Sequence, residues 1–420
     1  MRTTPTNSIP VTLSNGIWRI VGGFCVCGFF AGIFPTLWET AADEPSFADS
    51  KPLVKKSEGE AESMWSWDLP PGFPVPRVPT ENPMSEAKVR LGRTLFYDTR
   101  LSVDQSMSCG TCHRQELAFT DGLARPTGVT GELHPRSSMS LVNVAYNVGL
   151  TWDDPNIPSL EEQLTTPIFG HDPVEMGMER SEDLLARLRD DWLMELAFHD
   201  AFGPGPEEGQ TITMDRLAAA IASFERTLIS GNSAFDRFMY QDQEDALSPE
   251  ARRGMRLFFS RRLGCSDCHR GFNFSAPIVF EGSRDHEPEF HNTGLYNGSF
   301  SDRSFSELHG REEAPELGNY PEINPGLRRH TGKRSDTGRF KAPSLRNIAV
   351  TAPYMHDGSV PDLDAVIDHY AAGGRAGDNP YKSEFVAGFQ LSEAEREDLK
   401  AFFHALTDAD FLTDPALGPP

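Results

Sequence analysis

Apolar residues recur at helical spacing in several stretches of the chain, whereas the alternating patterns typical of strands are rare. Residues 181–198 and 214–230 each place their apolar side chains on one helix face. Ser392 and Glu395 form a capping box that opens a further helix. Residues 275–345 are rich in Gly, Pro, Asn and Arg and predict long loops. The pattern therefore predicts an all-α protein with long loops.

A weak internal repeat runs through the chain. Residues 85–96 and 248–258 both open with a Ser that can cap a helix, and both contain the pattern Gly-x-x-Leu-Phe. Each segment precedes a Cys-x-x-Cys-His unit. The repeat predicts two related units, each with a short helix that leads into a loop carrying the two cysteines.

The N-terminal region has the pattern of an export segment. An uncharged run extends from Ile20 to Trp38, and small residues follow near Ala42. We expect residues 1–42 to be a signal peptide, and an uncleaved membrane anchor is the alternative because the run is 19 residues long. Residues 43–64 are polar and aperiodic and predict a flexible tether.

The net charge of the chain limits the kinds of molecule that it is expected to bind. The chain has 420 residues, which suits about two to three domains, and a formal net charge of −23. Such acidity argues against nucleic acid and anionic membrane surfaces as partners. It either steers a basic protein partner, such as a small electron-carrier cytochrome, or only confers solubility.

Four of the six cysteines lie in two Cys-x-x-Cys-His units, Cys109-Gly-Thr-Cys112-His113 and Cys265-Ser-Asp-Cys268-His269. Two thiols on one turn can each add to a haem vinyl group, and the adjacent His then ligates the iron. A four-cysteine zinc site usually spaces its pairs about 15–20 residues apart, much closer than these. A thioredoxin-like pair needs neither the His nor a second copy. The units therefore indicate two covalently bound c-type haems.

Several longer blocks carry a family resemblance. They include residues 95–102, 109–121, 140–143, 160–163, 224–228 and 290–295, and the most specific is residues 340–358. From Trp65 to Leu406 the chain thereby resembles the bacterial di-haem cytochrome c peroxidase superfamily. The resemblance implies two cytochrome-c-like haem domains. Residues 65–235 would hold a peroxide-reactive haem, and residues 236–410 an electron-transfer haem.

Tyr370 separates two branches of that superfamily. Leu363, Val366, Ile367 and Tyr370 share one helix face, and Gly373 follows where the helix should end, so the phenol points inward. From the residues alone, a packed core tyrosine and a haem ligand both stay open. Peroxidases carry a Met nineteen residues after the Thr of Thr-Ala-Pro, where this chain has Tyr. The resemblance is therefore closest to the MauG/MbnH-like branch and implies that Tyr370 ligates the second haem.

The resemblance also implies a set of residues around the first haem. Gln163, Pro167 and Glu175 would lie over its open face, with Glu175 as the general acid and base for peroxide. The spacing from Gln163 to Glu175 is two residues longer than the family pattern. His134 is the one His in the loop where some peroxidases carry a removable haem ligand. It is either such a ligand or a loop residue.

Two further features follow from the same resemblance. Trp152 matches a tryptophan that lies between the two haems and lets electron holes pass. Thr351 and Pro353 match two positions around a calcium ion between the domains, and an Asn side chain, for which Asn143 is the candidate, would add a third. Oxygen donors of this kind suit calcium.

The expected function is a di-haem peroxidase that uses hydrogen peroxide and oxidises residues of a partner protein in the periplasm. A cytochrome c peroxidase fed by a small cytochrome is the first alternative. A pure electron-transfer di-haem cytochrome, with both irons six-coordinate, is the second.

Overall fold

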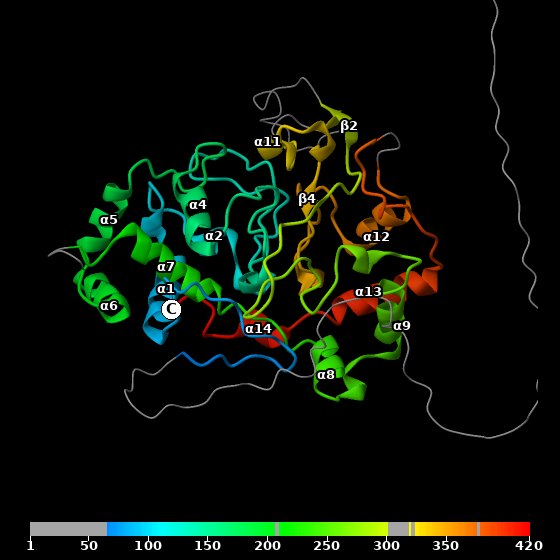
Figure 1. Ribbon diagram of the computed structural model, residues 1–420, viewed down its shortest axis with the longest axis horizontal. Coiled ribbons are helices and arrows are strands. Elements are labelled where there is room, and N and C mark those ends of the chain that lie inside the picture. The colour runs from blue at the N-terminus through cyan, green and yellow to red at the C-terminus, as the bar shows by residue number, and fades with distance from the viewer. Residues whose placement is uncertain (1–64, 206–209, 301–318, 321–323, 376–378) are drawn as a thin grey trace, which may run out of the picture. The chain divides into compact units, whose positions relative to one another are not determined.

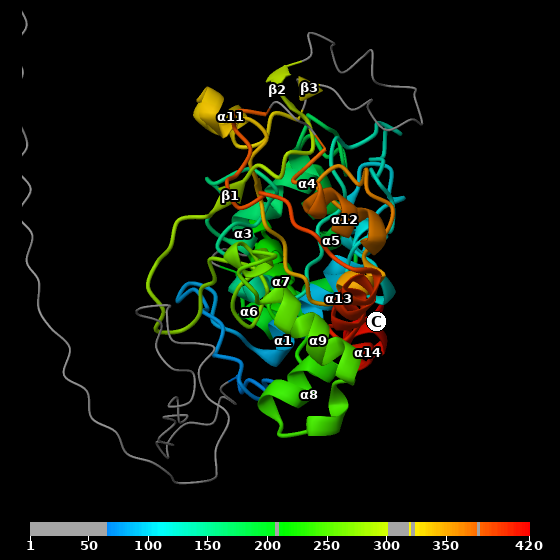
Figure 2. The ribbon, with the colours of Figure 1, turned by 90° about the vertical axis from the view of Figure 1, so that its right-hand side faces the viewer.

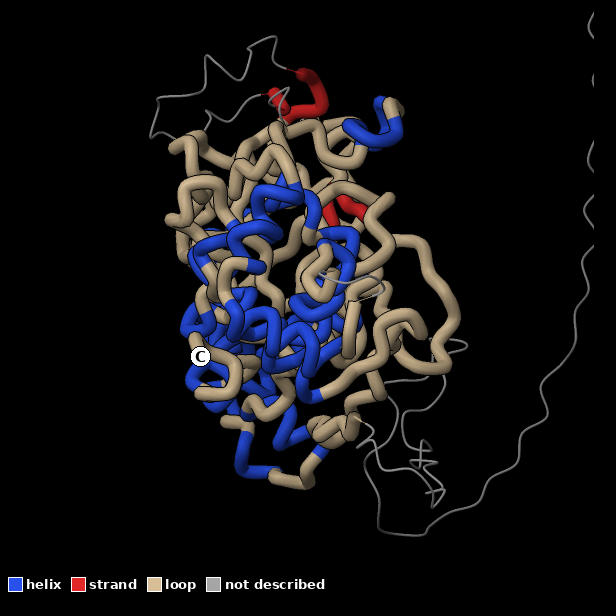
Figure 3. The backbone as a smooth tube through the Cα atoms, turned by 90° about the vertical axis from the view of Figure 1, so that its left-hand side faces the viewer, coloured by secondary structure: helices blue, strands red, loops and turns tan. Residues whose placement is uncertain are grey.

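The computed structural model describes residues 65–420 except 206–209, 301–318, 321–323 and 376–378. Helices and loops make up nearly all of this part (Figure 3), and the prediction of an all-α fold is confirmed. None of the described helices combines the length and apolar character needed to cross a bilayer. The expected export segment, membrane anchor and tether in residues 1–64 lie outside the described residues.

Two helix pairs organise the structure. Helix α1 (Glu86–Phe96) packs on α7 (Met214–Glu225), and α9 (Pro249–Phe258) packs on α13 (Glu393–His404) (Figure 1). The glycine of the shared Gly-x-x-Leu-Phe pattern explains why the two helices of each pair approach so closely. A Cβ at Gly92 would lie 1.9 Å from the carbonyl oxygen of Ala220, and one at Gly254 would lie 1.9 Å from that of Asp398. Only glycine allows the helices to approach so closely.

The remaining described helices are short and flank these pairs. They are α2 (Cys109–Cys112), α3 (Leu160–Gln163), α4 (Thr165–Phe169), α5 (Ser181–Arg189), α6 (Trp192–Phe202), α8 (Ala234–Tyr240), α11 (Arg328–Thr331), α12 (Leu363–Ala371) and α14 (Ala409–Thr413). Single 3₁₀ turns are η1 (Thr99–Leu101), η2 (Gln115–Leu117), η3 (Val144–Tyr146), η4 (Glu244–Ala246), η5 (Cys265–Asp267), η6 (Arg334–Asp336) and η7 (Ile348–Val350).

Strands are minimal in the described ranges. The antiparallel pair β1 (Phe290–His291) and β4 (Phe340–Lys341) sets Phe290 opposite Lys341. Strands β2 (Asn297–Phe300) and β3 (Asn319–Tyr320) run parallel and lie side by side (Figure 2). The connections between residues 275 and 345 that the structure describes are mainly irregular, as the sequence predicts.

Helix ends follow the expected capping residues in most places. Ser85, Ser248 and Ser392 each accept a backbone N–H in the first turn of α1, α9 and α13. The prediction of one helix over residues 181–198 is wrong, because α5 and α6 are separate helices. The side chain of Asp191 caps α6 by accepting the N–H of Leu193, and this local bond competes with continuation of the helix.

Buried apolar side chains form two main clusters. One lies between Leu91 and Leu228 and includes Phe411 and Leu417 from the C-terminal tail. The other lies between Phe235 and Leu406. The tail beyond residue 410 therefore packs on the first of these clusters. The Tyr97 hydroxyl donates to the carbonyl oxygen of Leu417 at 2.8 Å. The domain boundaries at residues 65–235 and 236–410 stay a prediction.

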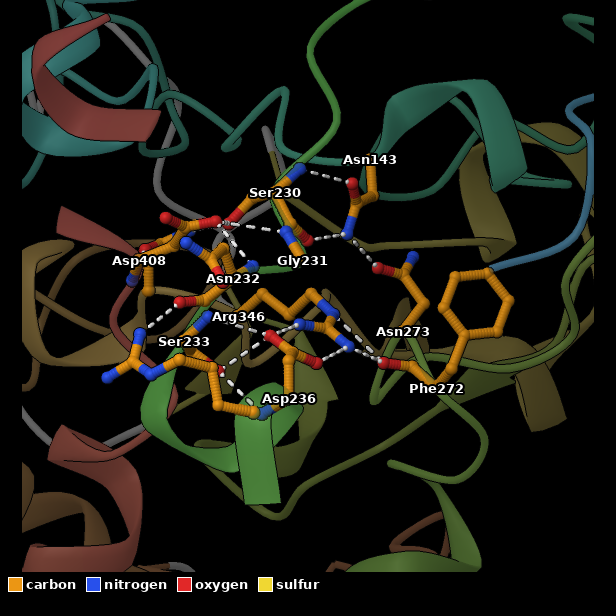
Figure 4. A network of polar contacts seen from close by, with 12 residues as sticks. Asn143, Ser230, Gly231, Asn232, Ser233, Asp236, Phe272, Asn273, Arg346 and Asp408 are labelled. Carbon is orange, nitrogen blue, oxygen red and sulfur yellow. Dashed lines mark hydrogen bonds and ion pairs between the residues drawn. The ribbon is translucent and has the colours of Figure 1, made fainter. Parts of the chain in front are cut away.

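A buried polar network ties the two clusters together (Figure 4). Arg346 makes two hydrogen bonds to the carboxylate of Asp236, at 2.8 and 2.9 Å, and both side chains are almost fully buried. One carboxylate oxygen of Asp408 accepts the backbone N–H groups of Gly231 and Asn232. These bonds fix the segment that leads from the first helix pair to the second.

Candidate haem sites

The first Cys-x-x-Cys-His unit forms a single helical turn. Cys109 and Cys112 are the first and last residues of α2, and His113 follows. The Nδ1–H of His113 donates to the carbonyl oxygen of Phe119 at 2.8 Å. Phe119 adopts a φ of +59°, a left-handed conformation that is uncommon for a bulky residue. This hydrogen bond orients the ring and leaves Nε2 as the nitrogen available to a metal.

The second unit repeats this arrangement. Cys265 begins η5, and the Nδ1–H of His269 donates to the carbonyl oxygen of Phe274 at 3.0 Å. Phe274 also has a positive φ, +49°. Burial lowers the pKa of His269 to about 4, so its imidazole is neutral at physiological pH and can act as a ligand.

A largely apolar cavity of about 400 Å³ adjoins the second unit. Cys265, Cys268, His269 and Tyr370 all line it. Its size is that of a cofactor or ligand pocket, and the thiols and imidazole are the groups that a c-type haem requires. The residues present therefore fit a covalently bound haem.

Tyr370 lies in the last turn of α12, and Leu363, Val366 and Ile367 line the same cavity. Gly373 has a φ of +77° just after the helix, as the expected helix end requires. Burial raises the pKa of the Tyr370 phenol well above its ordinary value, and the nearby Cys268 and Cys265 add to this shift. Tyr370 thus lines the same cavity as the two cysteines that would hold the haem.

The residues expected around the first haem lie on two joined segments. Gln163 ends α3, Pro167 lies in α4, and both are half-buried. The N–H of Met176 donates to the carbonyl oxygen of Pro167 at 3.0 Å, which holds the segment of Glu175 against α4. Burial raises the pKa of the Cys109 and Cys112 thiols, and the charge of Glu175 adds a smaller contribution in the same direction, which puts its carboxylate within electrostatic range of this unit.

His134 faces Glu175. Its Nε2 lies 3.3 Å from Oε1 of Glu175, and its Nδ1 contacts the backbone of Arg136. The N–H of Val129 donates to the carbonyl oxygen of Glu175 at 2.8 Å, so the loop of His134 is fixed to the Glu175 segment. The structure thus shows His134 as a loop residue whose ring contacts Glu175, and its role as a haem ligand stays a prediction.

Trp152 also lines the cavity of the second unit. Its indole N–H donates to the carbonyl oxygen of Ser137 at 2.9 Å. The N–H of Ser137 in turn donates to the carbonyl oxygen of His356 at 2.9 Å. The loop of residues 134–138 therefore contacts both sites. His134 contacts Glu175 near the first site, and Ser137 bonds to Trp152 and His356, which line the second cavity.

Comparison with known proteins identifies the family. Residues 86–244 match the family described as di-haem cytochrome c peroxidase, and residues 339–371 match RoxA-like, cytochrome c-like proteins. The chain is 35% identical to the methylamine utilization protein MauG of Methylorubrum extorquens, over 78% of this chain and 80% of that protein. It is also 35% identical to the cytochrome-c peroxidase IdrP1 of a Pseudomonas species, over 83% of this chain and 89% of that protein.

The chain belongs to the di-haem cytochrome c peroxidase family, which includes MauG. As a family member it is a di-haem oxidoreductase of the peroxidase type with two c-type haems. A solved structure of a MauG-like protein associated with microbial copper homeostasis matches with a TM-score of 0.75 and 40% identity. That match covers 85% of this chain and 99% of the other. The di-haem peroxidase BthA from Burkholderia thailandensis shares the fold at 19% identity, with a TM-score of 0.59.

The expected calcium residues have other partners. The Asn143 side chain accepts the N–H of Ser230 at 2.8 Å and donates to the carbonyl oxygen of Ser230 at 3.0 Å. The hydroxyl of Thr351 donates to the carbonyl oxygen of Ile348. Pro353 is half-buried nearby in sequence. These contacts add no support for calcium, which stays a prediction.

The structure adds residues that sequence reasoning did not single out. Phe119 and Phe274 supply matching carbonyl oxygens to the two histidines, and their place after each Cys-x-x-Cys-His unit is the signal that a repeat alignment could have used. Lys341 and His356 line the second cavity and are buried. Both lie in the recognised block of residues 340–358, but a lysine or histidine in a sequence carries no sign of its burial.

Proposed function

We propose that this di-haem enzyme reduces hydrogen peroxide at the haem of His113 and withdraws the electrons from a residue of a partner protein. Each hydrogen peroxide takes two electrons and two protons and becomes two water molecules. The observation that carries the proposal is the position of Tyr370 in the same cavity as Cys265, Cys268 and His269. A tyrosine there distinguishes the second haem from the Met-ligated haem expected of a peroxidase fed by a cytochrome.

The first site supplies proton transfer. When bound, the haem iron supplies the redox chemistry with peroxide. Glu175 would accept a proton from one peroxide oxygen and return it to the other, which then leaves as water. His134 orients the Glu175 carboxylate through its Nε2, while Gln163 and Pro167, from the adjoining helices α3 and α4, would lie over the same face of the haem.

The second site stores the oxidising equivalent. Tyr370 would give up its phenol proton on binding ferric iron, and the resulting phenolate, a hard anionic donor, would stabilise that state and lower the reduction potential relative to Met. Trp152, on the cavity wall and hydrogen-bonded to the loop of His134, offers an aromatic route between the sites. The fixed loop gives this route a defined geometry.

A cytochrome c peroxidase is the second candidate. Its support is the 35% identity to a cytochrome-c peroxidase and the net charge of −23, which would attract a basic electron donor. We also propose that the protein acts in the periplasm after export through residues 1–42.

Peroxide addition to the fully oxidised protein separates the two candidates. The proposal expects an oxidised form that persists without an electron donor, together with slow turnover of a reduced small cytochrome. Rapid turnover of that cytochrome, with no persistent form, supports the peroxidase instead. A protein spectrally unchanged by peroxide would indicate a pure electron carrier.

Glu175→Gln tests the first site. Loss of the general acid and base should slow the reaction with peroxide by about 10²–10⁴-fold. Glu179→Gln is the matched control, because Glu179 is an exposed carboxylate in the same segment. Equal rates in both variants would remove Glu175 from the proposal.

A further inference from the structure

Lys341 is a buried cation that has no ion-pair partner among the residues that the structure describes. Its side chain lies on β4 and only 5% of the residue is exposed. Within the described ranges, its ammonium has neither an ion pair nor a hydrogen bond, although its backbone N–H donates to the carbonyl oxygen of Trp152. Burial alone lowers its pKa to about 8, and no carboxylate offsets that shift. A buried charge of this kind is costly unless a partner neutralises it.

Neighbouring backbone segments hold Lys341 in place on both its side chain and its main chain. Its stem runs past Gly149, where a Cβ would lie 3.3 Å from Cδ of the lysine. Its pairing opposite Phe290 in the β1–β4 ladder fixes the backbone. The side chain lines the cavity that Cys265, Cys268 and His269 also line. The unpaired ammonium is thus at the wall of the cavity that suits the second haem.

We propose that Lys341 binds a propionate carboxylate of the haem attached at Cys265 and Cys268. A c-type haem keeps its two propionates free after the vinyl groups have reacted, so it brings an anion into the cavity together with the iron. An ammonium and a carboxylate pair strongly where water is excluded. Arg262, which also lines this cavity, already pairs with Glu395.

Lys341 is therefore a positioning residue for the second haem. By neutralising a propionate it makes reduction of the iron easier, because less negative charge remains near the metal. Its backbone N–H also donates to the carbonyl oxygen of Trp152 at 2.8 Å, which ties β4 to the backbone of that residue. This inference rests on haem attachment at the second unit and is independent of the peroxide chemistry proposed above.

Potentiometric titration of the haem-loaded protein, without peroxide, tests the inference. Lys341→Met should lower the equilibrium constant for reduction of the second haem at least tenfold, which is about 59 mV for one electron. Lys341→Arg keeps the charge and should remain within about threefold of the wild type. Lys400→Met is the control, since it removes a lysine whose charge Asp364 and Glu397 already neutralise.

The outcomes are distinct. A shift in Lys341→Met alone supports the ion pair, and so does loss of the second haem from Lys341→Met with full haem content in Lys341→Arg. An unchanged potential in Lys341→Met overturns it. Equal shifts in Lys341→Met and Lys400→Met also overturn it, as does loss of the haem from both Lys341 variants. A normal peroxide reaction alongside any of these results leaves the proposed function standing.

Discussion

The buried ion pair between Arg346 and Asp236 offers a sharp test of how much the buried polar network stabilises the fold. Arg346→Met removes two hydrogen bonds to Asp236 and two more to the carbonyl oxygen of Phe272, at 2.6 and 2.9 Å. It also removes the contact of the guanidinium with the Phe73 ring, 4.8 Å away. The Asp236 carboxylate would remain buried and lose its cation (Figure 4).

The expected cost follows from that unpaired charge. Breaking a buried pair by removal of one partner destabilises a protein by about 3–5 kcal/mol. Denaturant unfolding of the haem-loaded protein should show this loss as a lower midpoint. Arg396→Met is the comparison, since Arg396 pairs with the exposed Asp368 and such pairs contribute about 0–1 kcal/mol. Equal costs for the two variants would refute the role assigned to the buried network.

Three further predictions concern packing, protonation and the first site. Gly254→Ala inserts a methyl group 1.9 Å from the Asp398 carbonyl oxygen and should lower the free energy of unfolding by about 1–3 kcal/mol; a higher free energy of unfolding would mean that helix propensity outweighs the clash. Burial raises the pKa of Glu225 from 4.5 to about 8, so the folded state keeps a proton and its stability should fall as pH rises through that window. Glu225→Gln should flatten this fall in unfolding measurements at pH 5 and pH 8, and an unchanged slope would contradict the assignment. His134→Ala should slow the reaction with peroxide by about tenfold, the lower end of the usual effect of losing an orienting hydrogen bond, whereas an unaltered rate would show that Glu175 needs no such partner.

Local sequence signals were sufficient for much of the architecture. The Ser caps at residues 85, 248 and 392 mark helix starts because a hydroxyl satisfies free N–H groups in any protein. The repeated Gly-x-x-Leu-Phe pattern marks two equivalent crossings because close helix packing excludes a Cβ. Spacing and family resemblance placed Tyr370 on α12, whose inward face lines the second cavity.

Other features depend on contacts between distant segments, which no local pattern encodes. The break at Asp191 replaces one expected helix by two, since a side-chain cap outweighed a continuous apolar face. The pairing of His134 with Glu175 joins two loops 41 residues apart in sequence. The burial of the Lys341 ammonium at the cavity wall, away from any carboxylate of the described residues, depends on all the segments that pack around it. Such features become visible only when the tertiary structure is known.

The central claim is that the two irons have unequal surroundings, with Tyr370 closing the second one. Spectroscopy and potentiometry of Tyr370→Met test this most directly. Methionine favours ferrous iron more than a phenolate does, so the account predicts a higher reduction potential and an altered spectrum for the six-coordinate haem, with the other haem unchanged. An identical spectrum and potential in Tyr370→Met would contradict the account, because the phenol could not then be a ligand of that iron.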